Sequence, residues 1–415
     1  MLLPTVVLLT ILAFVRATSD PSLRILPDES LAKLQFNANL ASEADLDTAQ
    51  LVDKYEYHSE VHTVVTHDGY ILTMHRLRGK TVTSSNEQKP VALVMHGLLA
   101  SSAVWVLSGP EKSLGFVLSD AGYDVWLGNV RGSMYSRKHI NPSIAKKDYW
   151  NFSWHEIGTI DLPAMIDYIL KTTGREKLFY LGHSQGTTSF FVMSTQLPEY
   201  QDKIHAMFAM APVAYSSRMT SPIFQLLARF ITPIDLVAKL IGQYEFEPTS
   251  EGMKRFQELI CVEGAIMQPI CSNVLFLIAG YDRDQLNKTL LPTILGHVPA
   301  GASTKQFVHY AQLITSGKFQ QFDYGFFGNL GIYNSIFPPK YDLSKIRVPI
   351  ALHYSSNDWL SDVRDVDQLY NELGKPFAKF RVPHDGFNHL DYMWAKDVNT
   401  LLYDKILSLM TRFKN

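Results

Sequence analysis

The residues Gly182-His183-Ser184-Gln185-Gly186 form a G-x-S-x-G motif between two contrasting segments. The apolar run Leu178 to Leu181 before it is typical of a buried strand, and Thr187 to Gln196 after it is typical of a helix. A serine at a sharp turn from strand to helix projects its hydroxyl from the edge of a sheet, and the glycines leave room for that turn. The motif therefore predicts that Ser184 lies at the edge of a sheet, and Ser184 is the candidate nucleophile of this chain.

Short apolar, strand-like runs alternate with helix-like segments along most of the chain. The strand candidates are residues 61–65, 70–74, 91–95, 123–127, 178–181, 205–210, 349–354 and 378–382. The helix candidates are residues 111–120, 157–170, 187–196 and an amphipathic C-terminal segment, 398–413. This alternation predicts an α/β fold, with a mainly parallel central sheet and helices on both of its faces.

The alternation stops between residues 214 and 342. This stretch holds helix-spaced apolar clusters and the aromatic run Phe319, Phe322, Tyr324, Phe326 and Phe327. We expect an inserted, mostly helical cap over the carboxyl edge of the sheet, with most of these side chains in a core. A second domain with ordinary core packing is the alternative. The predicted divisions are residues 20–213 and 343–415 for the two parts of the α/β core and 214–342 for the cap.

The chain begins with an apolar run, Leu2 to Val15, which is too short for a transmembrane span of ~20 residues. Ala17 and Ser19 follow in the small-x-small pattern of a cleavage site, although a positive n-region is missing. We predict a secretory signal peptide over residues 1–19, with a buried N-terminal helix as the alternative. No later run has the length of a transmembrane segment, so we expect none in the mature chain.

Secretion changes the interpretation of several side chains. Cys261 and Cys271 would meet an oxidising compartment, where they form either one small disulfide loop or two buried thiols. Asn151 and Asn287 begin the sequons Asn-Phe-Ser and Asn-Lys-Thr, so both are candidate N-glycosylation sites. The sequence therefore predicts a protein of the secretory pathway, either extracellular or lysosomal.

Charge and motif spacing exclude several classes of function. The chain has 38 basic and 40 acidic residues without a block of like charge, which argues against a nucleic-acid partner. Two cysteines cannot supply a four-sulfur zinc site, and His155-Glu156 lacks the second histidine of H-E-x-x-H. Residues 128–132 fit neither a dinucleotide fingerprint nor a phosphate loop. We predict no metal and no cofactor, and no obligate protein partner is inferred.

His96-Gly97-Leu98-Leu99 directly follows the strand candidate 91–95. Where a serine occupies such a turn, the loop in this position supplies one backbone N–H to a developing oxyanion, and the residue after the serine supplies another. Leu98 and Gln185 are therefore the candidate oxyanion-hole donors, whereas we expect His96 to be structural.

A serine nucleophile needs a base, and the base needs a carboxylate that orients it. Asp358 lies in a turn-forming sequence at the carboxyl end of strand 349–354, where such an acid belongs. Asp362 and Asp365 are rivals, but they follow a helix-like start, and we expect them to cap the helix or face solvent.

Two histidines, His384 and His389, follow strand 378–382 and could act as the base. His389 opens the last helix and has apolar neighbours, which suit the wall of a site. His384 precedes an Asp-Gly turn, where we expect an exposed side chain. The predicted triad is therefore Ser184, Asp358 and His389, in the chain order Ser, Asp, His.

With these residues in place, the chain resembles the acid lipase family of gastric lipase and lysosomal acid lipase, from about Asp45 to its end. The resemblance rests on six blocks in one order: Asp68 to Leu72, His96 to Ser102, Gly128 to Ser133, Gly182 to Gly186, Ser316 to Phe319 and Asn388 to Asp391. It implies an α/β-hydrolase fold, the same triad, the same two oxyanion-hole donors and a mobile lid within the insertion.

The resemblance also bears on residues outside the triad. Cys271 matches a family cysteine that pairs with one just upstream, which implies a Cys261–Cys271 disulfide. Ala279 stands where relatives have a further free cysteine. Three matching charged residues are expected to be structural: Asp124, Arg131 and Asp161.

The implied function is that of a secreted or lysosomal serine lipase. It would hydrolyse carboxylic esters of neutral lipids, triacylglycerols and/or sterol esters, at a lipid–water interface through an acyl-enzyme. A carboxylesterase for small soluble esters is the main alternative, because it has the same catalytic residues. A thioesterase or acyltransferase, and a non-catalytic lipid-binding protein on a hydrolase scaffold, are remote alternatives.

Overall fold

The computed structural model describes residues 43–80, 89–141, 147–226, 228–229, 244–246 and 275–414. The predicted signal peptide (1–19) and the pair Cys261 and Cys271 lie outside the described residues, so both stay predictions. None of the helices in the described ranges is long and apolar enough to cross a membrane.

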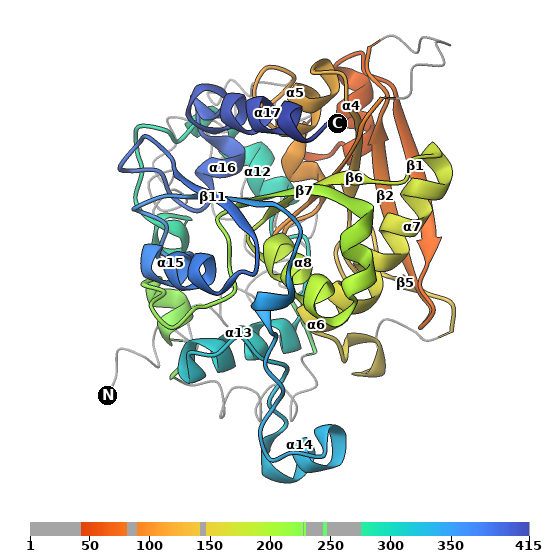
Figure 1. The fold of residues 1–415 in the computed structure, drawn as a ribbon. Coiled ribbons are helices and arrows are strands. Elements are labelled where there is room, and N and C mark those ends of the chain that lie inside the picture. Colours follow the sequence, from red (N-terminus) through yellow and green to blue (C-terminus); the bar gives the residue numbers. More distant parts are fainter. Residues whose placement is uncertain are drawn as a thin grey trace, which may run out of the picture.

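Within the described residues, nine strands form one sheet in the order β1-β2-β4-β3-β6-β7-β10-β11, with β5 paired to β2 (Figure 1). β1 and β4 both run antiparallel to β2, and each neighbouring pair from β4 to β11 is parallel. The prediction of a mainly parallel sheet is confirmed. The bounds are β1 Ser59–Val65, β2 Tyr70–Leu77, β3 Val91–Met95, β4 Asp124–Gly128, β5 Lys138–His139, β6 Leu178–His183, β7 Ile204–Met210, β10 Ile350–Tyr354 and β11 Pro376–Arg381.

The burial of each strand explains its composition. β3, β4 and β6 are buried along their whole length, as expected for central parallel strands covered on both faces. The edge strand β1 alternates between partly and fully exposed positions, and its Val61 and Val65 point to solvent. The continuous apolar runs in the sequence therefore mark the centre of the sheet.

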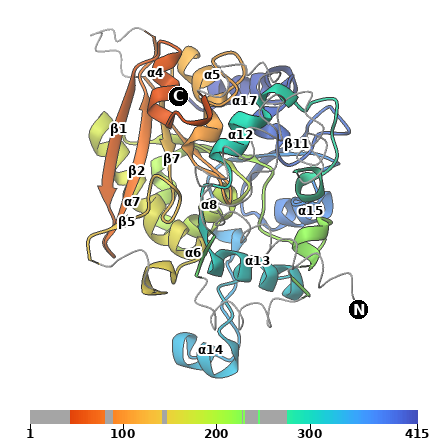
Figure 2. The ribbon, with the colours of Figure 1, turned by 180° about the vertical axis from the view of Figure 1, so that it is seen from behind.

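Helices cover both faces of the sheet, which confirms the prediction (Figures 1 and 2). Side chains that alternate along one strand enter two separate cores: Leu93 and Tyr180 belong to one, Val94 and Leu181 to the other. The first core includes residues of α7 Leu162–Thr173, α8 Gln185–Gln196 and α15 Val363–Glu372. The second includes residues of α4 Thr48–Lys54, α5 Leu114–Asp120, α16 Asp391–Trp394 and α17 Asp404–Met410.

The helix expected over 157–170 begins earlier and contains a wider turn. Its first turn is α6 Trp154–Glu156, where Ser153 and Glu156 form a capping box. A π-turn over Ile157–Asp161 then leads into α7, which ends at Gly174 in the left-handed conformation. At this turn Asp161 pairs with the buried Arg131, which also pairs with Asp68.

The range 211–349, between β7 and β10, adds no strand to the large sheet among its described residues. It contains α12 Leu291–His297, α13 Thr304–Ser316, α14 Gly325–Tyr333 and a small ribbon of β8 Glu245–Phe246 with β9 Ala302–Ser303. α13 lies against the start of α8, because Tyr310 contacts Thr188 and Gln306 hydrogen-bonds to Gln185. Part of the insertion therefore lies over the end of β6. Its division into a cap domain with a mobile lid stays a prediction.

The aromatic run of the insertion is only partly in a core, contrary to our expectation. Phe319 is buried, but Tyr324, Phe326 and Phe327 are exposed. They lie at and within α14, which projects from the body of the molecule (Figures 1 and 2). The composition of this run predicts aromatic side chains in a core, but the structure exposes Tyr324, Phe326 and Phe327 to solvent.

Candidate active site

Ser184 occupies a strained turn between β6 and α8. Its φ is 52° and its ψ is −118°, a backbone conformation that residues other than glycine rarely adopt. The flanking glycines are required by close packing: a Cβ on Gly186 would lie 2.6 Å from the Met95 carbonyl oxygen, and one on Gly182 would lie 2.9 Å from the Gly186 carbonyl carbon. The strand-to-helix elbow expected from the sequence is therefore present, with a half-buried serine at its tip.

The structure brings Ser184, His389 and Asp358 together. The His389 Nε2 lies 2.8 Å from the Ser184 Oγ, and its Nδ1 lies 2.8 Å and 2.9 Å from the two Asp358 carboxylate oxygens. His389 and Asp358 are both buried. With Nδ1–H donated to the carboxylate, Nε2 is left to accept the serine proton, which is the arrangement that acid–base chemistry at a hydroxyl requires.

The loop after β10 fixes the position of Asp358. One of its carboxylate oxygens accepts hydrogen bonds from the backbone N–H groups of Leu360 and Ser361, each at 2.9 Å. The Ser361 hydroxyl donates in turn to the Pro212 carbonyl, at the end of β7. The loop is therefore attached to the neighbouring strand, and the carboxylate cannot turn away from His389 without losing these bonds.

The rival residues lie elsewhere. Asp362 caps α15 by accepting from the Arg364 N–H, as expected. Asp365 neither caps nor faces solvent: it is buried and forms an ion pair with Arg218. His384 is half-buried rather than exposed, because its Nε2 lies 2.8 Å from an Asp282 carboxylate oxygen.

Gln185 follows Ser184 directly, and the loop that carries Leu98 approaches Ser184 at Gly97. Gln185 is the first residue of α8, so its N–H has no acceptor within the helix. The loop with Leu98 comes close because Gly97 has no side chain: a Cβ there would lie 3.1 Å from the Ser184 Cβ. The same loop is joined to the insertion, since the Leu99 carbonyl accepts from the Ala300 N–H at 2.6 Å.

Two buried histidines that we had not placed in the site support its backbone. His183 donates from Nε2 to the His389 carbonyl at 2.9 Å, and burial lowers its pKa well below the usual value, so the ring is neutral. His96 accepts at Nε2 from the Val130 N–H, and burial lowers its pKa to about 4. His96 thus has the structural position expected of it, whereas nothing in the sequence around His183 indicated its contact with His389.

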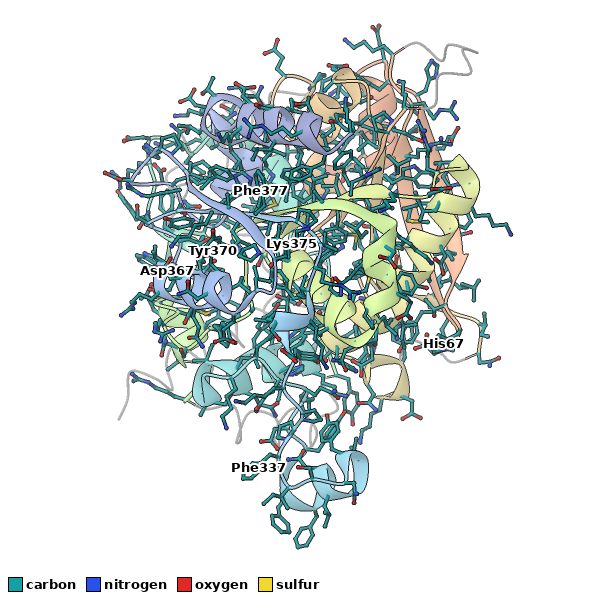
Figure 3. The ribbon with its side chains drawn as sticks, in the orientation of Figure 1. His67, Phe337, Asp367, Tyr370, Lys375 and Phe377 are labelled. Carbon is teal, nitrogen blue, oxygen red and sulfur yellow. The ribbon has the colours of Figure 1, made fainter. Side chains whose placement is uncertain are left out.

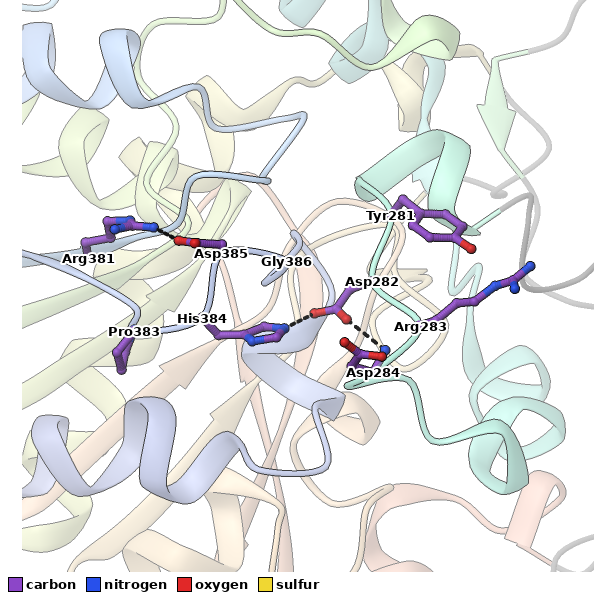
Figure 4. A pocket seen from close by; sticks show the side chains of 9 residues that line it. All are labelled: Tyr281, Asp282, Arg283, Asp284, Arg381, Pro383, His384, Asp385 and Gly386. Carbon is purple, nitrogen blue, oxygen red and sulfur yellow. Dashed lines mark hydrogen bonds and ion pairs between the residues drawn. The ribbon is translucent and has the colours of Figure 1, made fainter.

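A polar pocket that the sequence did not predict lies between residues 281–284 and the loop that follows β11 (Figure 4). It is lined by Tyr281, Asp282, Arg283, Asp284, Arg381, Pro383, His384, Asp385 and Gly386. Figure 4 shows His384 and Asp282 pointing toward one another across it. Asp282 also shares a hydrogen bond with Asp391, two residues after His389. Burial raises the pKa of Asp391 well above its usual value; the hydrogen bond from the Asn388 N–H opposes this shift, and the charges of Asp282 and Asp358 add to it.

The inserted segment contacts the loops that carry Asp358 and His389. The Ala279 carbonyl accepts hydrogen bonds from the N–H groups of Trp359 and His389, each at 3.2 Å. The Asn357 side chain donates to the carbonyls of Tyr281 and Gly386. Ala279 acts here through its backbone, which a cysteine in its place would also provide.

The two candidate glycosylation sites stay predictions. Asn151 is exposed, and its side-chain oxygen accepts from Lys305. Asn287 is partly exposed and caps a short helical turn. Within the described ranges there is no group of three side chains that could hold a metal ion.

Comparison with known proteins identifies the family. Residues 48–109 match the family described as a partial α/β-hydrolase lipase region, and residues 90–235 match the α/β-hydrolase fold. Lipase 3 of Drosophila melanogaster is 42% identical over 368 residues, which cover 89% of this chain and 93% of that protein.

Two mammalian relatives are similar over the same extent. Human lysosomal acid lipase/cholesteryl ester hydrolase is 38% identical, covering 90% of this chain and 92% of its own. Gastric triacylglycerol lipase of Bos taurus is 39% identical, covering 90% and 93%. Among solved structures, a putative lipase from Sulfolobus solfataricus superposes with a TM-score of 0.57 at 13% identity, over 86% of this chain and 95% of that one, which shows a shared fold.

The match to the α/β-hydrolase fold agrees with the mainly parallel sheet described above. The relatives match nearly their whole length, so the resemblance extends well beyond a shared core. The chain therefore belongs to the acid lipase family, and it is a carboxylic ester hydrolase, a lipase with the α/β-hydrolase fold.

Proposed function

We propose that this lipase hydrolyses esters of neutral lipids, triacylglycerols or sterol esters, with Ser184 as nucleophile, His389 as general base and acid, and Asp358 as the orienting carboxylate. The observation that carries the proposal is the His389 ring, whose two nitrogens lie 2.8 Å from the Ser184 Oγ and from an Asp358 oxygen. Both distances are within hydrogen-bond reach, which supports proton transfer from Ser184 to His389.

Acylation begins at the ester carbonyl. His389 Nε2 takes the proton of the Ser184 hydroxyl while the serine oxygen bonds to the carbonyl carbon, and the imidazolium is stabilised by Asp358. The carbonyl oxygen becomes an oxyanion, which the N–H groups of Leu98 and Gln185 would stabilise; loss of one such donor typically costs ~3 kcal/mol of the barrier reduction. The bond to the alcohol then breaks, and His389 gives its proton to the leaving alkoxide.

Deacylation repeats these steps with water. His389 takes a proton from a water molecule whose oxygen attacks the acyl carbon, and the second tetrahedral intermediate uses the same two N–H donors. Collapse of that intermediate breaks the bond to Ser184, whose oxygen recovers the proton from His389. A fatty acid and an alcohol are the products, and the chain returns to its starting state.

The substrate class rests on the relatives and on the charge of the chain. The mammalian relatives are named for triacylglycerol and for cholesteryl esters, both uncharged lipids. The net charge of −2 gives this chain no strong field for a charged substrate. Passage through the secretory pathway to the outside of the cell or to the lysosome is part of the proposal, supported by the apolar N-terminus, the two sequons and the gastric and lysosomal relatives.

The direct test replaces the nucleophile. Ser184→Ala should lower the hydrolysis of triolein and of cholesteryl oleate by about 10⁴-fold or more, because the covalent step is lost. Ser189→Ala is the matched control, since Ser189 lies one turn further along the same helix and is buried. It should keep full activity.

A fluorophosphonate should label the wild type and the Ser189→Ala variant but not Ser184→Ala, and all three should unfold at similar temperatures. Retained turnover by a folded Ser184→Ala variant would contradict the proposal. Rates on a series from acetate to oleate esters separate the lipase from a carboxylesterase for small soluble esters, which would favour the short chains.

A further inference from the structure

The polarity of α14 is inverted. Its one buried residue is the polar Asn329, whereas its apolar side chains face solvent. Phe327 is 84% exposed, more than any other large apolar side chain of the described residues, and Phe326 is 57% exposed. The other exposed apolar side chains of this segment are Tyr324, Leu330, Ile332, Ile336 and Phe337. We call residues 324–337 the apolar tip.

The tip is a defined structure rather than a loose loop. Asn329 Nδ2 donates to an Asp323 carboxylate oxygen and to the Ile336 carbonyl, and its Oδ1 accepts from the Tyr324 N–H. These bonds join the two ends of the tip around one buried amide. The apolar side chains are therefore turned outward by an internal polar contact, and they cannot turn inward without breaking it.

A short stalk connects the tip to α13. Its two strands are joined by a bridge between Gln320 and Lys340, and Gln312 on α13 hydrogen-bonds twice to the backbone of Asp323. α13 also contacts the catalytic elbow, since its Gln306 bonds to Gln185. Figure 3 shows aromatic side chains pointing away from the body at the tip, near Phe337. One rigid helix thus separates the tip from the residue next to Ser184.

From Tyr324 to Pro339 the sequence has no acidic, basic or histidine residue, and cations begin only at the base of the tip. There Lys305 donates to the Tyr324 hydroxyl, and Lys340 is exposed. An uncharged aromatic and aliphatic end, with Tyr324, Lys305 and Lys340 at its base, is the distribution found in segments that enter the surface of a lipid layer.

We propose that the apolar tip docks this lipase on the surface of its lipid, with Phe326 and Phe327 inserted among the acyl chains. The inference rests on the proposed action on neutral lipid. A second copy of the chain is a poorer occupant, because α14 has only nine residues and projects as a narrow end. Such an end cannot supply the ~800 Å² per partner of an ordinary stable interface.

The test uses the full chain with Ser184→Ala, so that lipid is bound but not consumed. The probe is triolein droplets coated with phosphatidylcholine, and binding is measured by flotation. Adding Phe326→Ser/Phe327→Ser should weaken binding by at least about tenfold, because two large apolar side chains no longer leave water. Phe326→Leu/Phe327→Leu should retain binding, since the tip stays apolar.

The matched control is Val61→Ser/Val65→Ser, which removes two exposed apolar side chains from the edge strand β1. It should bind droplets as the parent does. With Ser184 restored, the tip variant should lose at least about tenfold in the rate on emulsified triolein but keep its rate on soluble p-nitrophenyl butyrate within about twofold.

Unchanged flotation of the Phe326→Ser/Phe327→Ser variant would overturn the inference. So would a wild-type dimer that the variant dissociates without any loss on the emulsion, because the tip would then hold a second copy. Failure of the proposed function is distinguishable: a wild type that cleaves no long-chain ester contradicts that function, whereas flotation still decides whether the tip binds lipid.

Discussion

The loops around Ser184 and the apolar tip depart from the usual distribution of side chains in opposite directions. Around the triad, carboxylates and histidines are buried, and Asp358, His389 and Asp391 each have a hydrogen-bonding partner within the chain. At the tip, phenylalanines are exposed while an asparagine is buried. In the first region the protein satisfies the groups that it removes from water; in the second it leaves apolar surface in water.

Function is therefore inferred differently in the two regions: from hydrogen-bonding partners around Ser184, and from what could cover the surface at the tip. A buried polar group is costly unless it is hydrogen-bonded, so the partners of Asp358 and Asp391 reveal what each group does inside the protein. Exposed apolar surface has no such partner to examine, and its function lies in what covers it. The following predictions test whether the two regions are as independent as their opposite polarity implies.

The largest effect is expected from Asp358→Asn. An asparagine amide donates to His389 Nδ1, which places the ring proton on Nε2, where it can no longer accept from Ser184. We expect kcat on p-nitrophenyl butyrate to fall on the order of 10⁴-fold. Asp362→Asn, four residues further along and at the cap of α15, should leave kcat unchanged. A loss below tenfold for Asp358→Asn would show that the carboxylate does not orient the base.

A smaller effect is expected from Asp391→Asn, in the dependence of stability on pH. The pKa of Asp391 is raised in the folded state, so its contribution is complete below the unfolded value near ~4 and is lost as pH rises through the folded value. The charges of Asp282 and Asp358 act on Asp391, and His384 contacts Asp282. The wild type should lose up to about 1.4 kcal/mol of unfolding free energy per pH unit from this group in that range.

Asp391→Asn keeps a donor for Asp282 without a titrating proton, so its unfolding free energy should fall less steeply from acid to neutral pH. Urea unfolding between pH 4 and pH 8 measures both slopes. Asp385→Asn, on the same loop but exposed, is the control and should follow the wild type. Parallel curves for the wild type and Asp391→Asn would contradict a raised pKa of Asp391 in the folded chain.

The smallest effect is expected at the tip. Phe326→Ser/Phe327→Ser should change the free energy of unfolding by no more than about 0.5 kcal/mol, because both side chains are exposed in the folded chain. Phe190→Ala, at a buried position of α8, should lower the free energy of unfolding by about 3–5 kcal/mol. Thermal unfolding compares the two. A large loss for the tip variant would mean that its side chains support the fold, and the two regions would no longer differ as described.

Much of the fold could be predicted because its signals are local. β3 was placed at its observed bounds, and the other strands of the large sheet to within a few residues, since continuous apolar runs bounded by turns mark them. Strand β5, with two residues, was missed because so short a segment leaves no pattern. Ser184, Asp358 and His389 could be chosen together because parallel strands end at one edge of a sheet, so residues just beyond those ends meet.

The contacts that could not be predicted join segments far apart in the chain. Asp282 lies in the insertion and contacts Asp391, which follows the loop of His389. The sequence around neither residue predicts this contact. The tip was misplaced for a different reason. Apolar composition alone does not tell whether a hairpin folds back onto a core, and in α14 the buried Asn329 decides the matter.

The Ala279 carbonyl has a consequence for how such an enzyme can be altered. One oxygen from the segment between β7 and β10 holds the backbone N–H of His389 and that of Trp359, the neighbour of Asp358. Shortening that segment would remove the acceptor that these two N–H groups share, and with it a link between the loops of Asp358 and His389. An engineered exchange of this segment would therefore have to keep the Ala279 carbonyl in its present position.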